Sequence, residues 1–98
     1  MRLTDLEPRW IHPNMFAFRC PHCRKDWLTC KNIALSDHEQ FDIYEKAFGE
    51  DWNMQVVPCS PNFAWSIVGD FENLNVSPSI DASSSGHWHG FITNGETR

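Results

Sequence analysis

The sequence has little glycine, little positive charge and no long hydrophobic run, and each shortage counts against a class of function. Its five glycines are scattered, so no glycine-rich loop can cradle a phosphate group. Eight Lys and Arg face thirteen Asp and Glu, giving a net charge of −5. Neutralising nucleic-acid phosphates requires a cluster of positive charges. The nearest approach to such a cluster is a group of four basic residues around the first cysteine pair: Arg19, Arg24, Lys25 and Lys31. No apolar run reaches transmembrane length.

The first residues do not resemble a secretory signal, because Asp5 and Glu7 stand where an apolar segment is needed. The four cysteines are therefore expected to be metal ligands or free thiols, not disulfides. The expected compartment is the cytoplasm.

Large aromatic side chains are plentiful, with five Trp and seven Phe among the 98 residues. Rings of this size bury much apolar area each, so a few can build a core. The length allows one domain, residues 1–98, in which 1–13 form an N-terminal arm. At this size a bound metal often supplements the core.

Alternating and apolar segments predict several short strands. Residues 14–20 alternate and lead into a Cys-Pro-His-Cys turn, and residues 27–35 form the return strand. Further strands are expected in 64–68, 74–76 and 87–93, the last followed by an Asn-Gly turn.

One helix is expected over residues 37–48. Ser36 and Glu39 form a capping box, and Gly49 provides the stop. The predicted fold is therefore α+β: a small, mainly antiparallel sheet with one helix, stapled by zinc. Acidic residues lie on and just after the helix and are candidate partner-binding residues: Asp42, Glu45, Glu50 and Asp51. Their alternative interpretation is an ordinary solvated face.

The motif Cys20-Pro21-His22-Cys23 predicts half of a structural zinc site. Two thiolates two residues apart on a tight turn can reach one Zn²⁺. His87 and His89 are two apart in a predicted strand, so both are expected to face one side and complete a tetrahedral shell.

Other interpretations of the motif stay open. A thioredoxin-type redox pair should open a helix, whereas a strand precedes this motif and no helical run follows it. Cys30 or Cys59 could replace one histidine as a ligand, and the choice between His87 and Cys30 is not decided by the sequence. A shell of three protein ligands would leave a position for water, as in a zinc hydrolase or a nucleic-acid-processing enzyme. The sequence offers no further catalytic constellation, so an enzyme is the less favoured interpretation.

Two segments near the C-terminus are residues 76–80 (Val-Ser-Pro-Ser-Ile) and 87–96 (His-Trp-His-Gly-Phe-Ile-Thr-Asn-Gly-Glu). Together with the early Cys-Pro-x-Cys motif, Trp65 and Gly69-Asp70, they resemble a family of small uncharacterised bacteriophage and prophage proteins. Many relatives carry a Cys just before Trp-His-Gly, where this chain has Gly86 and His87. The helix at 37–48 looks like an insertion. The resemblance implies a metal-binding scaffold and a phage setting, without an assigned reaction.

The leading functional hypothesis is an accessory protein that acts by protein–protein binding in the host cytoplasm. Its acidic surface would occupy a basic surface of a host or phage protein, such as a nucleic-acid-binding defence complex of the CRISPR type. Direct nucleic-acid binding and membrane association are not expected.

Overall fold

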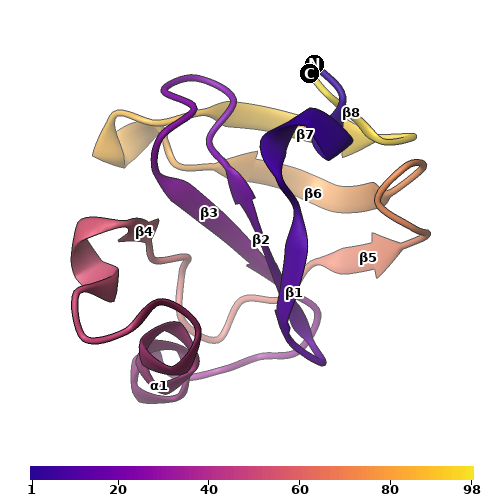
Figure 1. The fold of residues 1–98 in the computed structure, drawn as a ribbon. Coiled ribbons are helices and arrows are strands. Elements are labelled where there is room, and N and C mark those ends of the chain that lie inside the picture. The colour runs from indigo at the N-terminus through magenta and orange to yellow at the C-terminus, as the bar shows by residue number, and fades with distance from the viewer.

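In the computed structural model, which describes residues 1–98, eight strands form two four-stranded sheets, and one α-helix packs on the first of them (Figure 1). The helix α1 spans Asp37–Phe48. Three short 3₁₀ turns, η1 (Leu3–Leu6), η2 (Trp52–Met54) and η3 (Ser83–Ser85), lie in connections. The predicted α+β class and the predicted helix are confirmed, but the strands are divided between two sheets instead of one.

The first sheet has the order β1-β2-β3-β4. Its strands are β1 (Arg9–His12), β2 (Met15–Arg19), β3 (Trp27–Lys31) and β4 (Val56–Val57). The first three are antiparallel neighbours, whereas β4 runs parallel to β3. The N-terminal arm therefore belongs to the body of the protein, because β1 pairs with β2 and the side chains of Leu3 and Leu6 are buried.

The second sheet is antiparallel throughout, in the order β5-β6-β7-β8. Its strands are β5 (Ser66–Val68), β6 (Asn75–Asp81), β7 (His89–Thr93) and β8 (Glu96–Thr97). The predicted Asn-Gly turn joins β7 to β8, and both Asn94 and Gly95 have positive φ, as a tight hairpin turn requires. The register of β6 shifts between Val76 and Ile80, around Pro78, which is where a strand tolerates proline.

The first sheet is the middle layer of the molecule, and its strands β2 and β3 are buried on both faces. Phe16 and Phe18 of β2 point into a core shared with the second sheet, while Met15 and Ala17 point into a core shared with α1. The predicted alternation of β2 is thus confirmed, and both of its faces are apolar because each meets a different layer. Figure 1 shows the strands of this sheet running across those of the second sheet.

The helix α1 begins with the predicted capping box. The Ser36 side chain accepts a hydrogen bond from the Glu39 backbone N–H, and the Glu39 carboxylate accepts one from the Ser36 backbone N–H. These two bonds satisfy N–H groups that the first helical turn leaves without partners. Buried Ile43 and Tyr44 attach the helix to the first sheet. No helix in the structure is both long and apolar enough to span a membrane.

Candidate metal centre

The turn between β2 and β3 carries Cys20 and Cys23 and is closed by backbone hydrogen bonds. The Cys20 N–H donates to the Asp26 carbonyl at 2.8 Å, and the Arg24 N–H donates to the Cys20 carbonyl at 2.7 Å. Arg24 takes a left-handed conformation, with φ of 57°. The chain thus reverses within a few residues, so both thiols stay on the same turn.

His87 joins these two cysteines from the connection between β6 and β7. The Sγ atoms of Cys20 and Cys23 and one ring nitrogen of His87 all lie within 4.8 Å of one another. Cys20 is buried, His87 is partly buried and Cys23 is exposed. Two thiols and an imidazole bind zinc in preference to hard cations such as Mg²⁺ or Ca²⁺, which favour oxygen ligands. The three residues can therefore hold a metal ion, and the centre links the two sheets.

The ring of His87 lies between a thiol and a carboxylate. Its Nδ1 lies 3.6 Å from Cys23 Sγ, and its Nε2 lies 3.6 Å from Asp26 Oδ2. Its backbone N–H donates to the Ala82 carbonyl, which holds the connection in a compact loop. The neighbouring Trp88 points the other way, edge-on to Phe18 in the core between the sheets. The ring of His87 thus presents Nδ1 to the thiols and Nε2 to a carboxylate.

Asp26 lies beside the cluster, a position that its place in the sequence does not predict. Its carboxylate lies beyond the far nitrogen of His87, and its backbone N–H contacts Cys23 Sγ at 3.5 Å. Histidine ligands of metals commonly donate their second ring N–H to a carboxylate, and Asp26 lies on the side of His87 where such a partner is expected. The sequence carried one sign of this role, namely an acidic residue three positions after the second cysteine of the motif.

The surroundings of Cys23 favour its thiolate form. Partial burial by itself acts to raise the pKa of Cys23, but hydrogen bonds from the backbone of Asp26 and Lys25 and from the Cys20 side chain outweigh it and lower that pKa. Because the thiolate is the form that binds metal, this environment suits a ligand.

His89 is not brought to the cluster. The strand β7 begins at His89, so His87 lies in the preceding connection, and the two-residue alternation on which their pairing depended does not extend to His87. His89 is exposed, and it lies across from Asp81 in the register between β6 and β7. Of the two predicted histidines, the geometry thus brings only His87 to Cys20 and Cys23.

Cys30 and Cys59 also lie away from the cluster. Cys30 is fully buried in the core between the sheets, where burial and then the nearby Cys59 raise its pKa well above the usual value for a thiol. Cys59 is partly buried, in the loop after β4. The alternative in which Cys30 replaces His87 therefore has no support in the geometry.

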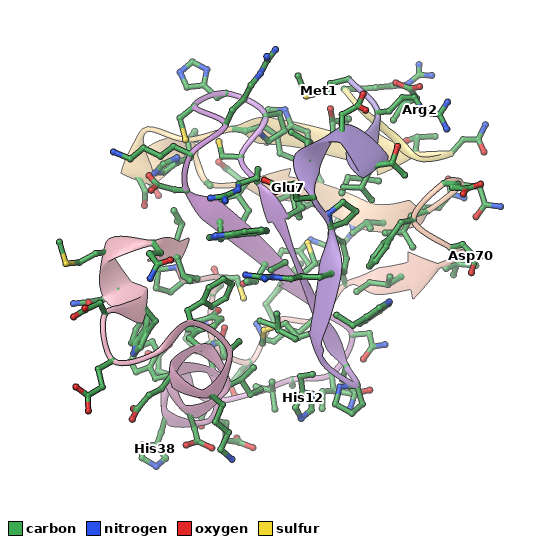
Figure 2. The ribbon with its side chains drawn as sticks, in the orientation of Figure 1. Met1, Arg2, Glu7, His12, His38 and Asp70 are labelled. Atoms are coloured by element: carbon green, nitrogen blue, oxygen red, sulfur yellow. The ribbon has the colours of Figure 1, made fainter.

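The remaining histidines have ordinary surroundings. His22 within the turn is exposed. Figure 2 shows His12 and His38 at the end of the molecule that carries α1, away from the turn between β2 and β3. His12 Nδ1 accepts a hydrogen bond from the Asn14 N–H at 3.1 Å. None of the three belongs to the cluster of Cys20, Cys23 and His87.

The acidic residues of the helix region are exposed, as a partner-binding surface requires. Lys46 Nζ lies 3.2 Å from Asp42 Oδ2 and offsets part of this charge. The exposed members of the group are Asp42, Glu45, Glu50 and Asp51.

The basic residues near the turn between β2 and β3 are less accessible to a nucleic acid than their sequence positions suggest. Lys31 is completely buried, and Arg19 pairs with Glu7 and stacks over Trp27. Only Arg24 and Lys25 stay exposed and without an acidic partner. Two exposed charges form a small footprint for a nucleic-acid backbone.

Comparison of the chain with models of protein families, with curated proteins and with solved structures found no match in any of the three.

Proposed function

We propose that the cluster of Cys20, Cys23 and His87 binds Zn²⁺ and that the ion staples the two sheets together. The observation that carries this proposal is the convergence of three ligand atoms within 4.8 Å from two different sheets. A metal bound there closes a chain segment of more than sixty residues, between Cys23 and His87. Because these ligands converge only in the folded chain, the binding free energy of the ion adds to the stability of the fold.

We further propose that the stapled domain is an accessory protein of phage type that acts by binding another protein. Support comes from the net charge of −5 and from the exposed acidic residues on and beside α1. Complementary charge steers association with a basic surface. A host or anti-phage defence complex that binds nucleic acid, such as one of the CRISPR type, has such a surface. The phage setting depends on the resemblance of the Pro-Ser-Ile and Trp-His-Gly segments.

Cobalt substitution tests the metal part of the proposal. The expected spectrum of the Co²⁺ protein has an intense thiolate-to-metal charge-transfer band and the visible bands of a tetrahedral ion. His87→Ala should change the visible bands, whereas the matched variant His89→Ala should leave them unchanged. The assigned ligands would be contradicted if the wild-type protein showed no charge-transfer band, or if the two variants changed the visible bands equally.

Affinity capture from bacterial lysate tests the partner part. The test variant reverses two charges on the helix, Asp42→Lys with Glu45→Lys. The control, Asp70→Lys with Glu72→Lys, changes the net charge equally at exposed residues of another face, where Figure 2 shows Asp70 on the far side from α1. The wild type and the control variant should both capture the same basic protein from the lysate. In a repeat with that partner purified, the helix variant should no longer bind it. Unchanged binding by the helix variant would overturn the electrostatic mechanism.

A second candidate function follows from the number of ligands. Three candidate protein ligands come together, and catalytic zinc sites typically combine three protein ligands with an open position for water. An open position predicts that added azide or cyanide shifts the visible bands of the cobalt protein. Bands that do not respond to either anion would favour the structural staple over a hydrolase.

A further inference from the structure

A second thiol, Cys59, lies in a polar cluster that the metal centre does not use. Its Sγ lies 3.2 Å from Lys31 Nζ and 2.8 Å from Gln40 Oε1. The hydroxyls of Thr29 and Tyr44 follow at 3.6 and 3.7 Å. Four polar side chains from β3 and α1 thus surround one sulfur atom.

Lys31 has no carboxylate partner in this cluster. Its side chain is fully buried, and no Asp or Glu oxygen lies within 4 Å of Nζ. Its contacts are the Ser60 carbonyl at 2.7 Å, the Trp65 ring, with Nζ 5.5 Å from the ring centroid, and Cys59 Sγ. A buried ammonium is costly unless a negative charge compensates it. Cys59 is the group at hydrogen-bond distance that can supply this charge.

The orientation of the Gln40 amide decides whether Cys59 Sγ donates or accepts a hydrogen bond, and in the orientation of the structure the thiol donates to Oε1 at 2.8 Å. The Gln40 side chain is fully buried, and its Nε2 has no hydrogen-bond partner, although its Oε1 contacts both Cys59 and Tyr44. Rotating the amide by 180° would direct this unpartnered donor toward Sγ, where a thiolate would accept its hydrogen bond. Burial, and then the nearby Cys59, raise the pKa of Tyr44 well above its usual value, so its hydroxyl keeps a proton to donate.

A cavity gives small molecules a route to this thiol. It has a volume of about 120 Å³, and its lining includes Cys59, Trp65, Asp81 and Ser84. The space suits a small polar molecule and not a bulky one. The charged and titratable groups that face the thiol or line this cavity are Lys31 and Cys30 of β3, Tyr44 of α1 and Asp81 of β6.

We propose that Cys59 is a modification site: a reactive thiol, held 3.2 Å from Lys31 Nζ, that is oxidised by small polar peroxides entering through this cavity. In the reaction the sulfur attacks one peroxide oxygen, an S–O bond forms and the O–O bond breaks. The products are a cysteine sulfenic acid and hydroxide, which takes up the proton that the thiol releases and leaves as water. Sulfur is oxidised and the peroxide is reduced, so no further co-reactant is needed. The site is independent of the proposed zinc centre.

Hydrogen peroxide is the probe, with dimedone as the trap for sulfenic acid and peptide mass spectrometry as the readout. Cleavage after Lys and Arg separates the thiols, because Cys59 is alone in residues 47–98, Cys30 is alone in 26–31, and the metal-centre pair lies in 20–24. Buried Cys30 is thus an internal control in each sample. Cys59 should be trapped before Cys30, and Lys31→Met, which removes the ammonium but keeps an unbranched side chain, should slow trapping at Cys59 about tenfold.

A synthetic peptide of residues 54–64 keeps the test decisive even if the variant does not fold. It contains Cys59 without Lys31, Gln40 and Tyr44. Trapping at Cys59 in the wild-type protein should be at least about tenfold faster than in the peptide. A protein rate equal to or below the peptide rate would overturn the proposal, as would an unchanged rate in folded Lys31→Met.

Discussion

His87 Nε2 lies 3.6 Å from Asp26 Oδ2, on the opposite side of the imidazole from the two thiols. A small approach of the two groups would let the carboxylate accept a hydrogen bond from Nε2 and hold the ring with Nδ1 toward the thiols. We therefore expect Asp26 to position His87 without being a ligand itself, since its carboxylate is not part of the three-residue cluster.

Asp26→Asn should lower the affinity for zinc about 10- to 100-fold, the usual cost of losing a carboxylate behind a ligating histidine. Competition with a chromophoric chelator measures this affinity. Asp70→Asn, at an exposed aspartate of another surface, is the matched control and should not differ from the wild type. Equal affinities in all three proteins would mean that Asp26 does not position His87.

Removing the metal should destabilise the fold. An ion that binds only the folded chain adds about 4 kcal/mol to the free energy of unfolding when its free concentration is a thousand times its Kd. Thermal unfolding with a chelator should therefore show a clearly lower Tm than unfolding with zinc. The same comparison in His87→Ala should show a smaller difference, and a Tm insensitive to zinc in the wild type would argue against a staple.

The capping box predicts a pH dependence of known sign. Hydrogen bonds from the Ser36 backbone N–H and side-chain hydroxyl lower the pKa of Glu39 from its usual value of 4.5. A carboxylate whose pKa is lower in the folded state stabilises that state fully above the unfolded value, and the contribution disappears as the pH falls through the folded value.

Glu39→Ala should accordingly reduce the free energy of unfolding at pH 7 and make little difference at pH 3, as measured by denaturant titration at both pH values. Glu45→Ala, at an exposed position later in α1, is the control and should lack this dependence. A difference between Glu39→Ala and the wild type that stays constant with pH would contradict the assignment.

Gly90 is expected to tolerate no side chain. A Cβ at this position would overlap the Arg98 carbonyl oxygen and lie 2.6 Å from the Trp88 ring. Gly90→Ala should lower the free energy of unfolding by about 1–3 kcal/mol, as overpacking does. Gly86→Ala has no atom within 4 Å of its added Cβ, and only its φ of 77° opposes the change. Thermal unfolding should rank Gly90→Ala as the more damaging, and the reverse order would contradict this packing.

The sequence predicted best the features that depend on neighbouring residues. The helix at 37–48 and its capping box are encoded within a few positions, and so is the turn that carries Cys20 and Cys23. His89 was misplaced relative to the cluster because one residue at the start of a strand decides which side chains alternate. The choice of His87 depends on where β7 begins, which pairing with β6 determines.

Features that depend on distant pairing were not predicted. The strand β4 has two residues and exists because it pairs with β3. The polar cluster at Cys59 joins residues 28 and 19 positions away, Lys31 and Gln40. The division into two sheets had a signal, since residues 15–18 are all apolar, as expected of a strand covered on both faces.

The middle position of the first sheet has a consequence for how the protein can evolve. Every residue of Met15–Phe18 and of Trp27–Lys31 is buried, whereas β7 alternates between exposed and buried positions. If the stability of every single substitution were measured, two continuous segments of the middle layer should tolerate few changes. Along residues 89–93, tolerant and intolerant positions should alternate. New surface traits can thus arise on the outer layers without disturbing the strands between them.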